Sequence, residues 1–172
     1  MDYLETERLI LRNIIPEDER DIFEYSQNPN VGINAGWKPH ETIEETRAVM
    51  NTIFIGQPDV FGIVLKSTRR VIGSIGLVND PKRSNDEVRM LGYALGEPYW
   101  GRGYMTECAK MIIEYGFDVL NLMYISAYCY PFNERSQNVL KKCGFVYEGK
   151  LSASEKSFDN KVYDELCYIL SR

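Results

Sequence analysis

The stretch "YWGRGYMTECAKMIIEYGF", residues 99–117, places two glycines on either side of an arginine, directly before a helical repeat. Apolar residues recur there at spacings of three and four, and polar residues fall on the other side. The preceding segment "VRMLGYALG", residues 88–96, has the composition of a strand. The pattern predicts a strand, a glycine turn and a helix that packs one face on a sheet. The expected buried face comprises Met105, Cys108, Ala109, Ile112, Ile113, Gly116 and Leu120.

A glycine turn between a strand and a helix suits an anion, because free backbone N–H groups and the positive end of the helix dipole meet there. A phosphate-binding P-loop is excluded, since Tyr104 and Met105 follow the second glycine in place of Lys and Ser or Thr. The dinucleotide fingerprint would need glycine at Thr106. A purely structural turn remains the alternative, because glycine also permits tight turns without binding anything.

The segments before this turn predict alternating elements. A strand is expected in "ERLILR" (7–12) and a helix in "PEDERDIFEYSQN" (16–28). The Asn-, Gly- and Pro-rich segment 28–39, "NPNVGINAGWKP", is expected to be a loop. A capping box of Thr42 and Glu45 then opens a second helix over 42–56.

The remaining segments complete a mixed sheet. A hairpin is expected from strands at 60–67 and 71–79, and after the quoted helix come strands at 123–130, 144–150 and 162–170, with a helix at 133–143. This order predicts an α+β fold, a mostly antiparallel sheet of about seven strands flanked by about four helices, with a βαβ crossover at the quoted helix. No repeat, low-complexity tract or linker interrupts residues 1–172, so one domain is expected.

Charge and composition narrow the partners. Twenty basic residues against 25 acidic ones give a net charge of −5, which argues against nucleic acid and favours a cationic or amine-bearing partner. No signal peptide and no apolar run of roughly 20 residues is present, so a cytoplasmic protein without membrane association is expected. The four separated cysteines indicate reduced core thiols and no metal site.

Two motifs together point to a family. "LGYALGEPYWGRGYMTEC" (91–108) and "NERSQNVLKKCGF" (133–145) resemble the GNAT superfamily of N-acetyltransferases, particularly its RimJ/RimL-like ribosomal-protein branch. The resemblance implies acetyl-CoA as co-substrate. It assigns the pantetheine arm to the strand from Leu91 to Leu95, the pyrophosphate to the turn, and the vicinity of the thioester to Asn133. The implied cofactor contacts are Leu91, Tyr93, Ala94, Leu95, Trp100, Gly101, Arg102, Gly103, Tyr104, Met105 and Asn133.

The chain departs from the family pattern at two positions. Pro98 stands where the turn often begins with Gln or Arg, and Leu140 stands where many relatives carry the tyrosine that protonates the leaving thiolate. In the resembling branch a serine three residues after the asparagine takes that role, which here is Ser136. From helix position alone, Ser136 is better explained as a packing residue beside Val139, and Asn133 is equally well explained as a helix cap.

Further candidates carry two readings each. Glu87 is the candidate base, at the start of the pantetheine strand on the side of Leu91 and Tyr93, or else an exposed hairpin charge. Trp37 is either an acceptor contact or a core anchor. His40 is expected to face solvent, and Cys143 to be buried. No cysteine has the setting of a nucleophile, so direct transfer is expected.

The sequence therefore predicts an acetyl-CoA-dependent N-acetyltransferase that acts on an amine. The leading acceptor is a protein N-terminal α-amine, and the rival is a small amine such as a polyamine, an amino sugar or a drug. A different class stays open, a non-catalytic CoA-binding sensor or interaction domain. A monomer or a homodimer is expected, with no nucleic acid, membrane or metal as partner.

Overall fold

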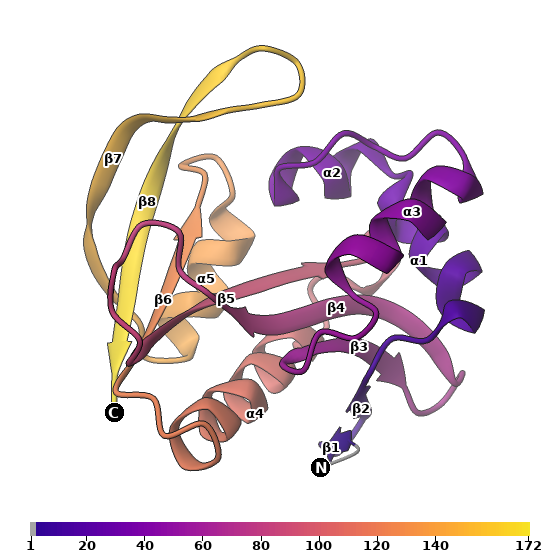
Figure 1. The fold of residues 1–172 in the computed structure, drawn as a ribbon, viewed down its shortest axis with the longest axis horizontal. Coiled ribbons are helices and arrows are strands. Elements are labelled where there is room, and N and C mark those ends of the chain that lie inside the picture. Colours follow the sequence, from indigo (N-terminus) through magenta and orange to yellow (C-terminus); the bar gives the residue numbers. More distant parts are fainter. Residues whose placement is uncertain (1–2) are drawn as a thin grey trace.

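An eight-stranded sheet and five α-helices make up residues 3–172, the part of the chain that the computed structural model describes (Figure 1). Two short 3₁₀ turns, Pro16–Asp18 and Glu97–Tyr99, precede α1 and the glycine turn. The elements in chain order are β1 (Tyr3–Glu5), β2 (Leu9–Arg12), α1 (Glu19–Ser26), α2 (Pro29–Ala35), α3 (Ile43–Ile53), β3 (Val60–Leu65), β4 (Arg70–Val78), β5 (Val88–Leu95), α4 (Tyr104–Asp118), β6 (Tyr124–Cys129), α5 (Glu134–Lys142), β7 (Val146–Lys156) and β8 (Val162–Ser171).

The sheet has the strand order β1-β2-β3-β4-β5-β6-β8-β7. Every neighbouring pair is antiparallel except β5 and β6, which are parallel and joined by α4. The α+β class, the mostly antiparallel sheet and the βαβ crossover are therefore confirmed. The strand β1 and the helix α2 are the elements beyond the expected seven strands and four helices.

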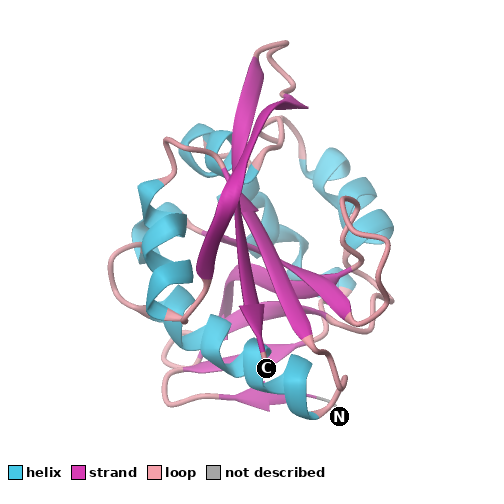
Figure 2. Ribbon diagram, turned by 90° about the vertical axis from the view of Figure 1, so that its left-hand side faces the viewer, coloured by secondary structure: helices cyan, strands magenta, loops and turns pink. Residues whose placement is uncertain are grey.

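The sheet opens between its two parallel strands. Only Val88 to Met90 of β5 pair with β6, on Tyr124 to Ser126, whereas β5 stays paired with β4 up to Leu95. In Figure 1, β3, β4 and β5 run across the molecule while β6 and β8 rise steeply away from them. Figure 2 shows the long β7–β8 hairpin reaching beyond the rest of the sheet. The strands thus diverge like the arms of a V.

The helix α4 packs on one side of the sheet as its periodicity predicts. Its buried residues are Met105, Cys108, Ala109, Ile112, Ile113 and Gly116. Gly116 permits the close approach, since a Cβ there would lie 2.8 Å from Leu77 Cδ1 on β4 and 3.1 Å from Ile125 Cδ1 on β6. A second apolar cluster, which includes Ile22, Val31 and Met50, lies under α1, α2 and α3.

The expected loop at 28–39 is wrong over most of its length, because α2 occupies Pro29–Ala35. Asn28 caps this helix by accepting a hydrogen bond from Asn30 N at 2.9 Å, and Pro29 occupies the first turn. Gly36 ends it in the left-handed region with a φ of 86°. The residues that suggested a loop are the start and stop signals of a short helix.

Two expected exposures are also wrong. His40 is buried, and its Nδ1 lies 2.8 Å from Thr46 Oγ1 of α3. Cys143 is only half-buried, whereas the other three cysteines are buried.

The capping box at α3 is half formed: Thr42 Oγ1 accepts from Glu45 N at 3.1 Å, but the Glu45 carboxylate accepts from Glu41 N.

We expect Ile112→Ala to lower the free energy of unfolding by about 3 kcal/mol, because Ile112 is fully buried and the change leaves a cavity. Glu114→Ala on the exposed face of the same helix is the matched control, with an expected change within about 0.5 kcal/mol. Urea denaturation measures both. Equal effects of the two substitutions would contradict the assignment of the buried face.

Candidate active site

A cavity of about 500 Å³ fills the opening between β5 and β6. Its walls come from β5, the glycine turn, the start of α4, β6, α5 and α2, with a single residue from β8. The predicted site residues that line it are Leu91, Tyr93, Ala94, Leu95, Trp100, Gly101, Gly103, Tyr104, Met105, Asn133 and Ser136. The two motifs of the sequence therefore meet on one cavity.

One wall of the cavity is an open strand edge. Beyond Met90, residues Leu91 to Leu95 pair with β4 on one side and have no register partner on β6. Backbone polar groups along such an edge are free to bond an extended ligand that takes the place of a strand. The indole Nε1 of Trp100 donates to Leu95 O at 2.7 Å, which joins the end of this edge to the turn.

The turn ends in free donors at the start of α4. Gly101 and Gly103 have φ values of 72° and 81°, which explains why glycine stands at both positions. Gly103 is the N-cap residue and offers no side-chain cap, and the first bond of the helix runs from Glu107 N to Gly103 O. The N–H groups of residues 104–106 precede that bond, so they are available to an anion.

Arg8, in the segment read only as a strand, holds the turn from behind. Its guanidinium bonds Glu107 of α4, with Nε 2.7 Å from Oε2, and Nη1 donates to Arg102 O at 3.0 Å. Although burial raises it, bonds from Thr6 and Arg8 bring the pKa of Glu107 below its usual value. The carbonyl of Arg102 is thereby engaged away from the cavity, and Arg102 itself does not line it.

A pair of hydroxyl groups spans the cavity from β5 to α5. Tyr93 OH lies 2.8 Å from Ser136 Oγ and 3.3 Å from Ser136 O. Burial raises the pKa of Tyr93 well above its usual value, and the bond to Ser136 offsets this only in part. The phenol therefore keeps its proton at neutral pH. No signal in the sequence linked these two side chains, which are 43 residues apart.

Asn133 joins two helices on either side of the cavity. Its Oδ1 accepts from Ser136 N at 3.1 Å, which makes it the N-cap of α5. Its Nδ2 donates to Asn34 O of α2 at 3.2 Å. The helix-cap reading of Asn133 is confirmed, and the same amide orients Ser136 and places α2 beside α5.

Charges divide along the cavity wall. Arg135 and Lys142 of α5 line one part, with the Arg135 guanidinium 4.5 Å from the centre of the Trp100 ring. Glu165 of β8 is the single carboxylate among the lining residues that the structure describes, and it is buried. Sequence reasoning missed Glu165, which directly follows Asp164 at the start of the apolar run "LCYIL" and so resembles an ordinary exposed acid.

Besides Arg102, two predicted site residues lie outside the cavity. Glu87 is exposed before β5, where its carbonyl accepts from Met123 N and Tyr124 N, and its carboxylate does not line the cavity. Trp37 packs against the cluster under α1 and α3, and its Nε1 donates to Ser26 O at 3.4 Å. Glu87 thus occupies the position of an exposed charge, and Trp37 that of a core anchor.

The thiols are poorly suited to nucleophilic chemistry. Burial raises the pKa of Cys129, which lines the cavity, to about 11, and also raises the pKa of Cys143. Within residues 3–172, no group of three or more His, Cys, Asp or Glu side chains is arranged to hold a metal ion. Over the same residues, no helix has the length and apolar character needed to cross a membrane.

Comparison with known proteins agrees with this geometry. The model of the acetyltransferase (GNAT) domain matches residues 8–146. The chain is 34% identical over 162 residues to an uncharacterized N-acetyltransferase, p20, of Bacillus licheniformis, covering 91% of this chain and 89% of that one. A GNAT-family acetyltransferase structure from Bacillus anthracis superposes with a TM-score of 0.86 at 26% identity over 98% of each chain.

A third protein shares the fold at lower identity. The structure of ribosomal-protein-S5-alanine acetyltransferase from Vibrio fischeri superposes with a TM-score of 0.78 at 24% identity, covering 98% of this chain and 96% of that one. Since the matching family model spans most of the chain and contains the open strand and the glycine turn, the protein belongs to the GNAT family of acetyltransferases.

Proposed function

We propose that this protein transfers the acetyl group of acetyl-CoA directly to a primary amine. The observation that carries the proposal is the continuous run from the open edge of β5 to the free N–H groups at the start of α4. The edge suits the amide-bearing pantetheine arm, and the turn suits the pyrophosphate. Arg135 and Lys142 add positive charge on the same side.

The hydroxyl pair supports a role for Ser136 in catalysis. The sulfur of CoA leaves as a thiolate, and a donor placed beside it stabilises the transition state more than the ground state. Ser136 would donate to that sulfur, and Tyr93, which keeps its proton, would supply the next hydrogen bond. Backbone N–H groups of residues 91–94 would polarise the thioester carbonyl. Tyr93 thus supplies a phenol near the leaving sulfur, which many relatives place at the position of Leu140.

The attacking amine must lose its proton before or during attack. Glu165 fits this role better than Glu87, because Glu165 lines the cavity and Glu87 does not. Transfer then forms the bond between the amine nitrogen and the acetyl carbon and breaks the bond between that carbon and sulfur. The amine proton leaves through Glu165 to solvent, and the Ser136 hydroxyl donates a hydrogen bond to the thiolate, which takes its proton from solvent as CoA is released.

A protein N-terminal α-amine, as in the RimJ/RimL-like branch, is the leading acceptor in this proposal. An α-amine titrates near ~8, against ~10.4 for a lysine-like amine, so it needs less help from a base. The rival acceptor is a small amine, which the buried carboxylate of Glu165 in the cavity wall would also attract. A panel of N-terminal peptides and polyamines, followed by thiol release from acetyl-CoA, separates the two. Binding of CoA without turnover of any amine would favour a sensor.

We expect Gly103→Val to weaken acetyl-CoA binding by about tenfold or more, because the side chain obstructs the approach of phosphate to the backbone donors. Gly56→Val is the matched control: Gly56 also has a positive φ, 79°, but lies after α3 with nothing within 4 Å of an added Cβ. Both variants carry similar backbone strain, so their melting temperatures should fall alike. Calorimetric titration that finds equal affinity in both variants would reduce the Gly103 turn to a packing feature.

We expect Ser136→Ala to lower kcat about 10²-fold or more with little change in KM for acetyl-CoA, since the lost bond matters mainly in the transition state. The melting temperature should stay near that of wild type, because alanine has the higher helix propensity and the Asn133 cap bonds the backbone. Tyr93→Phe should lower kcat in the same way but less.

Ser67→Ala, on an exposed turn, is the control for this pair and should keep the wild-type rate. Because the pKa of Tyr93 is raised, its proton is retained through the neutral range, and the rate should not decline on account of this group below about pH 10. An unchanged kcat in a folded Ser136→Ala variant would remove Ser136 from the mechanism.

Direct transfer predicts that no acetyl-enzyme forms. Incubation with acetyl-CoA alone should leave Cys108, Cys129, Cys143 and Cys167 unmodified, because burial raises the pKa of each of these thiols. Intact-mass spectrometry measures the adduct. A stoichiometric acetyl group on one of the thiols, passed on when an amine is added, would replace this mechanism by a two-step one.

A further inference from the structure

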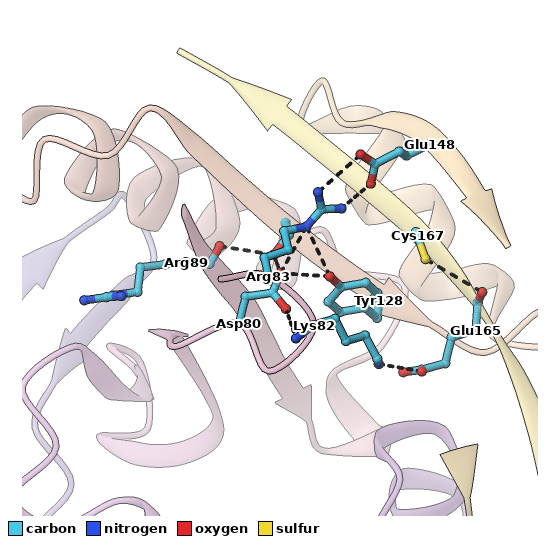
Figure 3. A network of polar contacts seen from close by, with 9 residues as sticks. Asp80, Lys82, Arg83, Arg89, Tyr128, Glu148, Glu165 and Cys167 are labelled. Atoms are coloured by element: carbon cyan, nitrogen blue, oxygen red, sulfur yellow. Dashed lines mark hydrogen bonds and ion pairs between the residues drawn. The ribbon is translucent and has the colours of Figure 1, made fainter. Parts of the chain in front are cut away.

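The acid of the cavity already holds an ammonium group. Lys82, in the loop between β4 and β5, places its Nζ 2.5 Å from Glu165 Oε2 and 4.2 Å from the centre of the Tyr128 ring (Figure 3). Glu165 and Tyr128 line the cavity, whereas Lys82 does not. A carboxylate and an aromatic face together make a site for a primary ammonium ion.

Neighbouring residues fix both halves of this site. Tyr128 OH donates to Asp80 Oδ2 at 2.8 Å, and Asp80 also accepts from Ser126 Oγ and from Lys82 N. Burial and the bond to Asp80 raise the pKa of Tyr128 to about 12, so it stays a neutral aromatic surface. On the other half, Ser154 Oγ of β7 donates to Glu165 Oε2 at 2.8 Å.

The lysine is the more exposed member of the ion pair. Its side chain is 27% exposed, against 11% for that of Glu165, and it reaches Glu165 from a loop, whereas Glu165 and Tyr128 stand on strands. An exposed lysine loses little when it moves into water, since its ammonium is strongly hydrated. A buried carboxylate, in contrast, needs a cation in that place.

We propose that Glu165 and Tyr128 form the subsite for the ammonium group of the acceptor, and that Lys82 occupies this subsite until the acceptor displaces it. This inference rests on the proposed function and names the chemistry of its acceptor, a primary ammonium compound. A peptide N terminus and a polyamine share that chemistry. Lys82 competes with the acceptor for Glu165. A neutral compound cannot replace the lysine ammonium at this carboxylate and is therefore excluded.

The test compares two substitutions with opposite expected signs. Glu165→Gln should raise KM for the amine about tenfold or more, because a charge-assisted contact is lost, while KM for acetyl-CoA stays unchanged. Lys82→Met should lower KM for the amine about threefold or more, because the competitor is gone. The double variant should behave like Glu165→Gln. The acceptor probes are spermidine and a tripeptide amide with N-terminal alanine, and thiol release is the readout.

The pair Lys150 and Asp164 provides the matched control. It is an ion pair at 2.8 Å on the same hairpin but is exposed, so Lys150→Met and Asp164→Asn should leave both KM values unchanged. If the Lys82–Glu165 pair were only structural, both single variants would lower the melting temperature and neither would alter KM for the amine selectively. That outcome would overturn the proposal.

A separate binding measurement distinguishes failure of the subsite from failure of the proposed function. If wild type released no thiol with either amine, the function would fail, and each amine would be titrated calorimetrically into the CoA complex. Tighter binding to Lys82→Met than to wild type would still support the subsite. If neither amine bound to Lys82→Met, the subsite would be overturned. This result decides the question even if Glu165→Gln does not fold.

Discussion

The short pairing between β5 and β6 is the constraint on which the rest of the site depends. Three residues of β5 meet three of β6, and beyond Met90 the two strands separate. A sheet that stayed closed would satisfy its own backbone and leave no room for a ligand. Because it opens, residues 91–95 keep their bonds to β4 on one side and offer the other side to the cavity.

The opening has to be supported from outside, since a gap in a sheet is otherwise unstable. The helix α4 packs beneath it through a face that Gly116 lets approach β4 and β6 closely. Asp80, in the loop before β5, accepts hydrogen bonds from Ser126, the last paired residue of β6, and from Tyr128, two residues beyond it. At the other end, Arg8 ties the glycine turn to Glu107. Support is thus placed at each end of the free edge.

Local patterns were sufficient for much of this architecture. The apolar spacing of α4 and the glycine turn before it are properties of consecutive residues, and they located one wall of the cavity. The helix α2 was missed because Asn28, Pro29 and Gly36 signal both loops and helix ends, and only the capping bond to Asn30 N distinguishes them.

The parts of the site that sequence reasoning missed depend on contacts between distant segments. Glu165 reaches the cavity because β8 lies beside β6, and Tyr93 meets Ser136 only after the strands have separated. Arg8 and Glu107 are 99 residues apart. His40 is buried, and Thr46 of α3 supplies the hydrogen-bond partner of its ring. Such placements follow from topology, which periodicity does not encode.

The two bonds of Asn133 limit which residues are interchangeable at that position. Serine, threonine or aspartate would also cap α5, since each offers an acceptor oxygen to Ser136 N. None of them has a donor in the place of Nδ2, and aspartate would bring negative charge against the carbonyl of Asn34. An amide alone serves both helices at once. The placement of α2 against α5, both of which line the cavity, therefore depends on a choice between side chains that are equivalent as helix caps.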